Sequence, residues 1–198
     1  MKPAGIIGGG EATPYSIPWQ VALVPPGGGR PFCGGTLISP RHVLTAAHCT
    51  GSYNGKWDIM VGEHSASDTS DGTRHAKCRY ENHPKYNEKT ANNDFAIVHL
   101  SQSVQFGTRA VPACLPTTNL GGDFLANKIL TVSGWGDTVP NKIVYPDVLH
   151  KVDVPGITNA VCSQKYGSGV ISEKMLCAGD VVNGGIDACH QDSGGTLN

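Results

Sequence analysis

The chain has 198 residues, enough for one large all-β domain or two small units with a buried core. Its 15 basic and 16 acidic residues leave a formal charge of -1, so neither nucleic acid nor a membrane is expected as a partner. Glycine (26) and proline (13) are frequent enough for many turns, yet below the level of low-complexity disorder. This composition favours many short strands over a few long helices.

Four stretches with short or alternating apolar runs predict strands, in the order 19–24, 57–64, 95–100 and 128–136. A turn of helix is predicted after Thr45, in "TAAHC". A longer helix is predicted from Thr158 to Tyr166, because Thr158 can cap its first turn and Gly167 can end it. The fold class is therefore all-β, while the pattern leaves open whether the strands form one sandwich or two barrels.

Seven cysteines without a C-x-x-C pair predict disulfides, and hence a secreted, extracellular protein, rather than a zinc centre. The odd number leaves one thiol without a partner. The first residues, "MKPAGIIGGGEATP", contain no apolar run long enough for a signal peptide, and no later segment is long enough to span a membrane. Export is therefore inferred from the cysteines alone.

Three segments carry side chains that are able to do chemistry: "LTAAHC" at 44–49, "NNDFAIVHL" at 92–100 and "DACHQDSGG" at 187–195. Taken singly, such a His, Asp or Ser is more often structural, as a turn or strand-start residue. Together they supply the three groups that hydroxyl attack on a carbonyl needs: a nucleophile, a base and an acid that orients the base. The order along the chain is His48, Asp94, Ser193.

At these residues the chain resembles the trypsin-like branch of the chymotrypsin family of serine proteases. The resemblance also covers "IIGG" and "PWQVAL" near the start, "CGGTLISPRHVLTAAHC" around His48, and "VSGWG" at 132–136, which matches a strand and turn of the family's second barrel. It implies two six-stranded antiparallel barrels with the active site in the cleft between them. The implied protease domain covers 6–198, and 1–5 is expected to be a leftover or artificial segment.

The resemblance implies that His48 is the general base, Asp94 its orienting acid and Ser193 the nucleophile. Asp187 matches the aspartate at the floor of the family's specificity pocket, where a buried carboxylate favours Arg or Lys before the scissile bond. The N–H groups of Gln191 and Ser193 would hold the oxyanion. The family usually has glycine at the position of Gln191, and a mis-aimed donor there lowers turnover by roughly 10² to 10³.

Asp192 matches the aspartate that pairs with a freed amino terminus in this family, and Ile6 would be that terminus. Gly5 precedes Ile6, whereas family precursors are usually cut after Arg or Lys. With Met1 to Gly5 attached, the protein is expected to behave as a precursor, that is, as a zymogen.

The resemblance also implies disulfides from Cys33 to Cys49 and from Cys162 to Cys177, which stabilise by limiting the unfolded chain. The partner of Cys189 in the family lies further along than Asn198. Leu130 stands where many members have another cysteine. The two cysteines that are left over, Cys78 and Cys114, are expected to pair with each other, unless Cys114 tethered a lost amino-terminal piece.

The chain stops five residues after Ser193, so the second barrel is expected to be incomplete, without its last strands and carboxy-terminal helix. The segment "VGEHSASDTSDGT" resembles the family's calcium loop at Glu63, with Asp68 or Asp71 as a substitute second ligand, although a solvated acidic loop is the simpler reading. No other cofactor or metal is expected. The histidines contain no H-E-x-x-H arrangement, so a zinc protease is excluded.

The leading hypothesis is a secreted, monomeric serine endopeptidase that cleaves proteins or peptides after Arg or Lys through an acyl-enzyme. Protein protease inhibitors are its expected further partners. A second hypothesis is a catalytically weakened homologue that acts as a secreted binding or regulatory protein, motivated by Gln191. A third, a disulfide-rich adhesion domain, rests on composition only. The complete set of His48, Asp94 and Ser193 favours the first, because neither alternative needs it.

Overall fold

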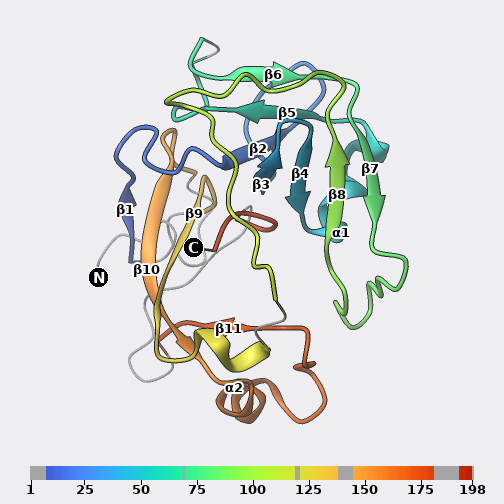
Figure 1. Ribbon diagram of the computed structural model, residues 1–198, viewed down its shortest axis with the longest axis vertical. Coiled ribbons are helices and arrows are strands. Elements are labelled where there is room, and N and C mark those ends of the chain that lie inside the picture. Colours follow the sequence, from blue (N-terminus) through green and yellow to red (C-terminus); the bar gives the residue numbers. More distant parts are fainter. Residues whose placement is uncertain (1–7, 69, 119–120, 138–144, 181–191, 198) are drawn as a thin grey trace.

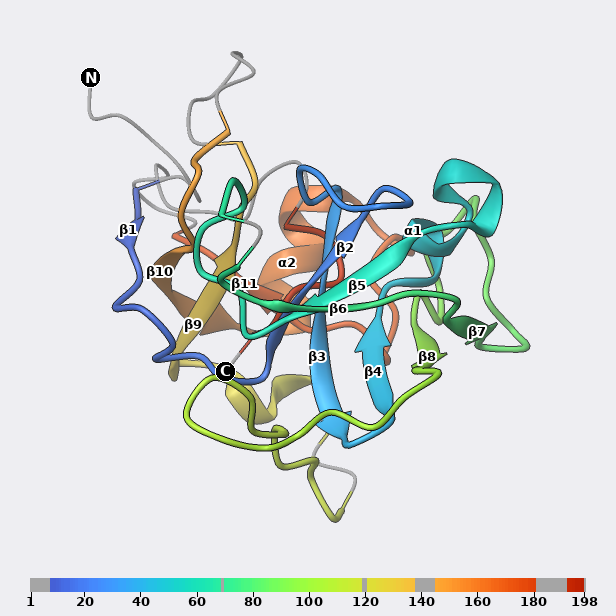
Figure 2. The ribbon, with the colours of Figure 1, turned by 90° about the horizontal axis from the view of Figure 1, so that it is seen from above.

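The computed structural model describes residues 8–68, 70–118, 121–137, 145–180 and 192–197. Most regular structure is antiparallel β, in two groups of strands that we call the first and second lobes (Figure 1). Figure 2 shows the same two groups from above, with β9 and β10 beside the strands of the first lobe. The all-β prediction is confirmed, and the two antiparallel sheets agree with a two-barrel architecture.

The first lobe is one antiparallel sheet with the strand order β6-β5-β2-β3-β4-β8-β7. Its strands are β2 (Gln20–Val24), β3 (Cys33–Ser39), β4 (His42–Thr45), β5 (Asp58–Val61), β6 (Thr73–His75), β7 (Arg79–Asn82) and β8 (Ala96–His99). Two short helices follow β4, namely α1 (Ala47–Thr50) and the 3-10 helix η1 (Ser52–Gly55). The helical turn predicted in "TAAHC" is thus present as α1.

The second lobe is built around the long strand β10, which pairs with β1, β9 and β11. Its elements are β1 (Gly10–Glu11), η2 (Gly122–Leu125), β9 (Ile129–Gly134), β10 (His150–Ile157), α2 (Asn159–Tyr166) and β11 (Cys177–Ala178). The predicted cap of α2 is confirmed, because the Thr158 hydroxyl accepts a hydrogen bond from the Val161 N–H at 3.3 Å. Gly167 ends the helix with a φ of 101°, a value that glycine adopts without strain.

Both faces of β2 are buried, and this joins the two lobes. Val21 and Leu23 point into the apolar cluster of the first lobe, because alternate residues of a strand face opposite sides. Ala22 and Val24 point into a second cluster, whose other buried members are Ala12, Ile17, Met60, Trp135 and Leu149. Apart from Gln20, the stretch "WQVALV" is therefore apolar, because it has no solvent-facing side.

Two disulfides fasten short elements to their sheets. Cys33 on β3 is joined to Cys49 in α1, and Cys162 in α2 is joined to Cys177 on β11. Each closes a loop of about 15 residues, for which the entropic model gives a stabilisation of roughly 3 kcal/mol.

The expected bridge between Cys78 and Cys114 is wrong, because both thiols are free. Cys78 packs half-buried against the apolar cluster of the first lobe, and its thiol donates to the His75 carbonyl at 3.3 Å. Burial raises the pKa of this thiol to about 11, so it is poorly reactive. Cys114 is exposed and follows Ala113, whose N–H is bound to the Leu37 carbonyl at 2.8 Å. Cys189 lies outside the described residues.

Among the helices of the described residues, none combines the length and the apolar character that a membrane crossing requires.

Candidate active site

The pairing of β4 with β8 brings His48 and Asp94 together. Thr45, at the end of β4, is directly opposite Ala96, at the start of β8. His48 lies in α1, which follows β4, and Asp94 precedes Ala96 by two residues. Both residues are therefore at the same end of the strand pair. Segments that are far apart in the sequence therefore meet because their strands are neighbours in the sheet.

Two hydrogen bonds hold Asp94 against His48. The backbone N–H of His48 donates to Asp94 Oδ1 at 2.9 Å, and His48 Nδ1 lies 2.7 Å from Asp94 Oδ2. A carboxylate beside Nδ1 fixes the tautomer with the proton on Nδ1, which leaves the lone pair on Nε2. The side chain of His48 is 45% exposed and that of Asp94 is 21% exposed, so Nε2 remains accessible to a substrate.

Ser193 lies on a tight turn that packs on the first lobe. Its carbonyl accepts the N–H of Gly34 at 2.8 Å, and the N–H of Gly195 donates to the Asp192 carbonyl at 2.9 Å. Gly194 has a φ of +76°, and a Cβ there would collide with the Thr45 hydroxyl. The glycines of "DSGG" and "CGG" are thus explained by close approach, since a Cβ on Gly34 would lie 2.7 Å from the Cα of Gly195.

The disulfide sulfur of Cys49 lies between His48 and this turn. It is 3.6 Å from His48 Nε2 and 3.6 Å from the Ser193 carbonyl oxygen. His48 Nε2 and the backbone of Ser193 therefore lie close to the same sulfur atom. Cys33, Cys49 and His48 would be a group of metal ligands by distance, but both sulfurs are consumed in the disulfide and are not thiolates.

The carboxylate of Asp192 is buried, with the residue 5% exposed. Its Oδ1 accepts the N–H of Gly136 at 2.8 Å, in the stretch "VSGWG". The other residues expected around the site, namely Ile6, Asp187 and Gln191, lie outside the described residues.

Two contacts from the second lobe reach the residues just before Asp94, and no sequence motif predicted them. The ammonium of Lys174 donates to Asn93 Oδ1 at 3.0 Å, and the hydroxyl of Ser172 donates to Asn92 Oδ1 at 3.1 Å. Asn93 has a φ of 55°, a left-handed conformation that asparagine tolerates better than most residues. The pair of asparagines in "NND" thus provides a turn and two side chains that contact the other lobe.

A buried polar network that sequence reasoning also missed connects the lobes behind the Ser193 turn. The hydroxyls of Ser133 and Thr196 each lie 2.8 Å from Gln20 Oε1, and 2.7 Å from one another. All three residues are at most 3% exposed. In the sequence, the sign of this network was a glutamine inside an otherwise apolar strand, because a buried amide needs partners.

Comparison with known proteins agrees with this geometry. The family model described as Trypsin matches residues 6–198. Rat "Transmembrane protease serine 9" is 36% identical over 195 residues, which are 97% of this chain and 18% of that protein. Rat "Serine protease 1" is 35% identical over 193 residues, which are 97% of this chain and 74% of that protein.

Among solved structures, mouse neuropsin, a serine protease, aligns with a TM-score of 0.81 at 32% identity, over 96% of this chain and 81% of that one. The chain belongs to the trypsin family. Its fold is chymotrypsin-like, and its reaction class is that of the family, serine endopeptidases.

The loop that follows β5 in this trypsin-family chain contains the buried carboxyl of Glu63. The residue is 8% exposed, and its Oε2 has no hydrogen-bond partner among the described residues. Burial, together with the charges of Asp71 and Asp147, raises the pKa of Glu63 from 4.5 to about 7. Around neutral pH this carboxyl is therefore partly protonated.

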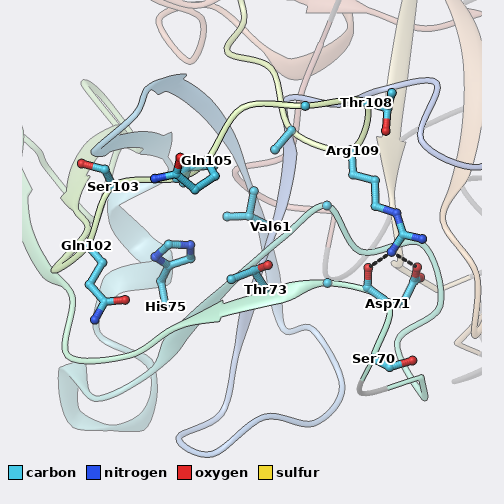
Figure 3. A pocket seen from close by; sticks show the side chains of 15 residues that line it. Val61, Ser70, Asp71, Thr73, His75, Gln102, Ser103, Gln105, Thr108 and Arg109 are labelled. Atoms are coloured by element: carbon cyan, nitrogen blue, oxygen red, sulfur yellow. Dashed lines mark hydrogen bonds and ion pairs between the residues drawn. The ribbon is translucent and has the colours of Figure 1, made fainter.

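The neighbouring carboxylate of Asp71 is surrounded by donors from the protein itself. The backbone N–H groups of His64 and Ser65 each donate to Oδ2 at 2.6 Å, and the Tyr15 hydroxyl donates to Oδ1. The guanidinium of Arg109 lies 3.8 Å from Oδ1 and donates to the Asp71 carbonyl at 2.9 Å (Figure 3). Burial acts to raise the pKa of Asp71, but these hydrogen bonds and Arg109 hold it below its usual value.

These residues do not fit a calcium ion. A calcium site needs six to eight oxygen ligands at about 2.3–2.6 Å. Asp71 is taken up by N–H and O–H donors beside a guanidinium, and Asp68 Oδ1 accepts from the backbone and hydroxyl of Ser70 at 2.9 and 2.7 Å. The buried Oε2 of Glu63 is the carboxylate oxygen of this loop that lies buried without a hydrogen-bond partner among the described residues.

A cavity of about 530 Å³ lies between β5, β6 and the segment 102–110, and its lining does not include His48, Asp94 or Ser193 (Figure 3). His75 points into it with both ring nitrogens unpaired among the described residues, and burial lowers the pKa of His75. Gln102 and Gln105 approach from the facing segment. The cavity is lined by both polar and apolar side chains and is separate from the candidate active site.

Proposed function

We propose that Ser193, His48 and Asp94 act together as the nucleophile, the base and the orienting acid of a serine endopeptidase. The observation that carries this proposal is the double hydrogen bond between His48 and Asp94, with His48 Nε2 and the Ser193 carbonyl each 3.6 Å from the sulfur of Cys49. A structural histidine would not need its ring oriented by a carboxylate while its second nitrogen remains accessible.

The proposed reaction has two halves. Ser193 Oγ attacks the scissile carbonyl carbon while its proton passes to His48 Nε2, and the carbonyl π pair becomes the oxyanion. His48 then gives that proton to the leaving amine, the C–N bond breaks and an acyl-enzyme ester remains. Water repeats the sequence with His48 as base and releases the free acid and Ser193. Asp94 stabilises the imidazolium in both halves without becoming protonated.

The oxyanion would be held by the N–H groups of Ser193 and Gln191. The hydrogen bond from Gly34 fixes the Ser193 carbonyl and thereby the orientation of the turn. Pre-set donors of this kind account for roughly 10² to 10³ in turnover each. A variant Gln191→Gly that gains nothing would show that the side chain of Gln191 does not disturb this donor.

Cleavage after Arg or Lys is proposed from Asp187 alone. A carboxylate at the base of a substrate pocket, if unpaired, disfavours an uncharged guest. We further propose an extracellular, monomeric protein that meets protein or peptide substrates and protein inhibitors, since its two disulfides suit an oxidising compartment.

We propose that activity requires a free amino group on Ile6 to pair with the buried carboxylate of Asp192. A positive partner stabilises a buried carboxylate. Protein that retains Met1 to Gly5 should therefore be inactive, as a zymogen is. Mass analysis of active material should find Ile6 as the first residue, and full activity of intact material would exclude this pairing.

The alternative is a weakened homologue that works by binding partners, for which Gln191 is the motive. One experiment separates the two. Peptide esters of Arg, Lys, Phe and Ala are assayed with the Ile6 form of the protein, with Ser193→Ala, and with Ser70→Ala, an exposed serine, as control. Turnover of Arg and Lys esters that is lost only in Ser193→Ala supports the protease. Turnover that is absent, or unchanged by Ser193→Ala, supports the binding protein.

For the loop after β5 we propose closure without calcium, by the pairing of Asp71 with Arg109 and Tyr15. Melting curves in calcium and in EDTA should then coincide, while Arg109→Ala lowers the melting temperature in both. A rise in melting temperature with calcium that is lost in Glu63→Gln would contradict this proposal.

A further inference from the structure

The outer face of the first lobe carries two histidines on adjacent strands. His42 on β4 is directly opposite His99 on β8. Val43 and Val98, the next residues along, are fully buried in the core, so the two imidazoles lie on the opposite face of the sheet. This pair is three residue pairs along the two strands from Thr45 and Ala96. It is therefore separate from the site of His48 and Asp94.

A carboxylate from the third strand, β7, completes the group. Glu81 Oε1 lies 3.5 Å from His99 Nε2, yet this nitrogen is buried and has no hydrogen-bond partner among the described residues. The contact is therefore not a hydrogen bond. Two ligand atoms on one tetrahedral zinc ion, with bonds near 2.0–2.1 Å, are about 3.3 Å apart, which is close to the separation found here.

The two imidazoles have a spacing that suits a shared ion. Their ring centroids are 5.1 Å apart with an interplanar angle of 78°. Zinc bonds of about 2 Å to two tetrahedrally arranged imidazoles give ring centroids about 5 Å apart. The spacing of the two backbones therefore does not need to change for both rings to bind one ion.

An orienting hydrogen bond is present on the far side of His42. Ser39, across the two-residue turn between β3 and β4, has its Oγ 2.7 Å from His42 Nδ1. When Nδ1 is the donor, Nε2 keeps its lone pair. Histidine ligands of metals are almost always held in this way by a partner of the second ring nitrogen.

We propose that His42, His99 and Glu81 form a binding site for a divalent transition-metal ion, zinc in the first place, with water as a fourth ligand. Two imidazoles and a carboxylate are the donors that zinc prefers over calcium or magnesium. In the present rotamers the three side chains do not converge on one point. Glu81 is 80% exposed, so its side chain is free to rotate toward a bound ion.

A neighbouring positive charge and the protonation of the ligands both affect zinc binding at this site. Arg79, on β7 opposite His99, is exposed and is the cationic neighbour that a bound ion must tolerate. Because metal ligands must be unprotonated, binding should weaken in acid. A bound ion would tie together β4, β8 and β7, and so raise the melting temperature.

The test is zinc titration by calorimetry at pH 7.5 on the full chain carrying Ser193→Ala, which prevents self-digestion. One zinc per molecule is expected, and cobalt should give the visible spectrum of a tetrahedral ion. His42→Gln and His99→Gln should each weaken zinc binding by roughly a hundredfold or more. Ser39→Ala removes only an orienting partner, so it should weaken zinc binding by roughly 10–100-fold.

His83→Gln is the matched control, because His83 is a histidine of the same lobe that stacks on Phe95 instead. Melting curves without zinc show whether each variant is folded, and Glu81→Gln tests the group with a substitution on an exposed side chain. No binding, binding that is unchanged in His99→Gln, or binding that is lost in His48→Gln instead would overturn the proposal. The outcome of this zinc titration does not test the proposed serine-protease chemistry.

Discussion

His48 and Asp94 lie in the first lobe, which has a large apolar core. Ser193 comes after the second lobe in the chain, and the core of that lobe is small. The first lobe packs Val21, Leu37, Val98 and their neighbours into one cluster, while the second has Leu130, Val152 and Val154 with a few partly buried residues. The Ser193 turn is positioned instead by hydrogen bonds to the first lobe. The base and its acid thus lie in a lobe that apolar packing stabilises, whereas polar contacts between the lobes position the serine.

The largest expected effect is on kcat, and it comes from changing Asp94 beside His48 in the first lobe. Asp94→Asn should lower kcat by about 10⁴, the loss known for this substitution in serine protease triads, because the amide favours the wrong tautomer of His48. Steady-state hydrolysis of an Arg ester measures it. Asp153→Asn, on the exposed face of β10, is the control and should change kcat little. A loss below tenfold in Asp94→Asn would mean that this carboxylate does not orient the base.

Truncation of a core side chain tests whether the apolar core of the first lobe also positions His48 and Asp94. Leu37→Ala removes a fully buried side chain from the first-lobe cluster and should cost about 2–5 kcal/mol of unfolding free energy. Denaturant unfolding measures this. At temperatures where the variant is folded, its kcat should equal that of the parent. A large fall in kcat would show that the site is more sensitive to the core than the comparison supposes.

The buried carboxyl of Glu63 should make the first lobe weaken with rising pH. Its folded pKa of about 7 lies above its ordinary value of 4.5, so its contribution is fully present below pH 4.5 and is lost as the pH rises through 7. The loss amounts to roughly 3 kcal/mol. Glu63→Gln should remove this dependence and be the more stable protein at pH 8. Parallel stability curves of the two proteins from pH 4.5 to 8 would refute it.

The smallest expected change in stability belongs to the contacts between the lobes. Thr196→Val removes one hydroxyl from the network with Gln20 and Ser133 at nearly constant volume, at a cost of about 1–3 kcal/mol. Because Thr196 follows Ser193 by three residues, kcat should fall although the loss of stability is less than in Leu37→Ala. If kcat falls equally in the two variants when both are folded, polar and apolar contacts position the site alike.

The strands and helices were largely predictable because their signals are local. Alternation in "FAIVHL" and the cap at Thr158 depend on neighbours within one turn or strand, and both are present. The pairing of Cys78 with Cys114 failed because counting cysteines says nothing about distance. The role of Gly34 was not foreseen either, since it depends on the Cα of Gly195, a residue far along the chain.

By itself, the sequence determined the family, the all-β class and the residue types that the chemistry needs, because motifs and periodicity are properties of the chain. The tertiary structure alone decided that the pairing of β4 with β8 joins His48 to Asp94, and that the Ser193 turn rests on Gly34. It also decided that Glu63 is buried and that His42 faces His99. These facts depend on burial and strand register, which are set when distant segments pack together.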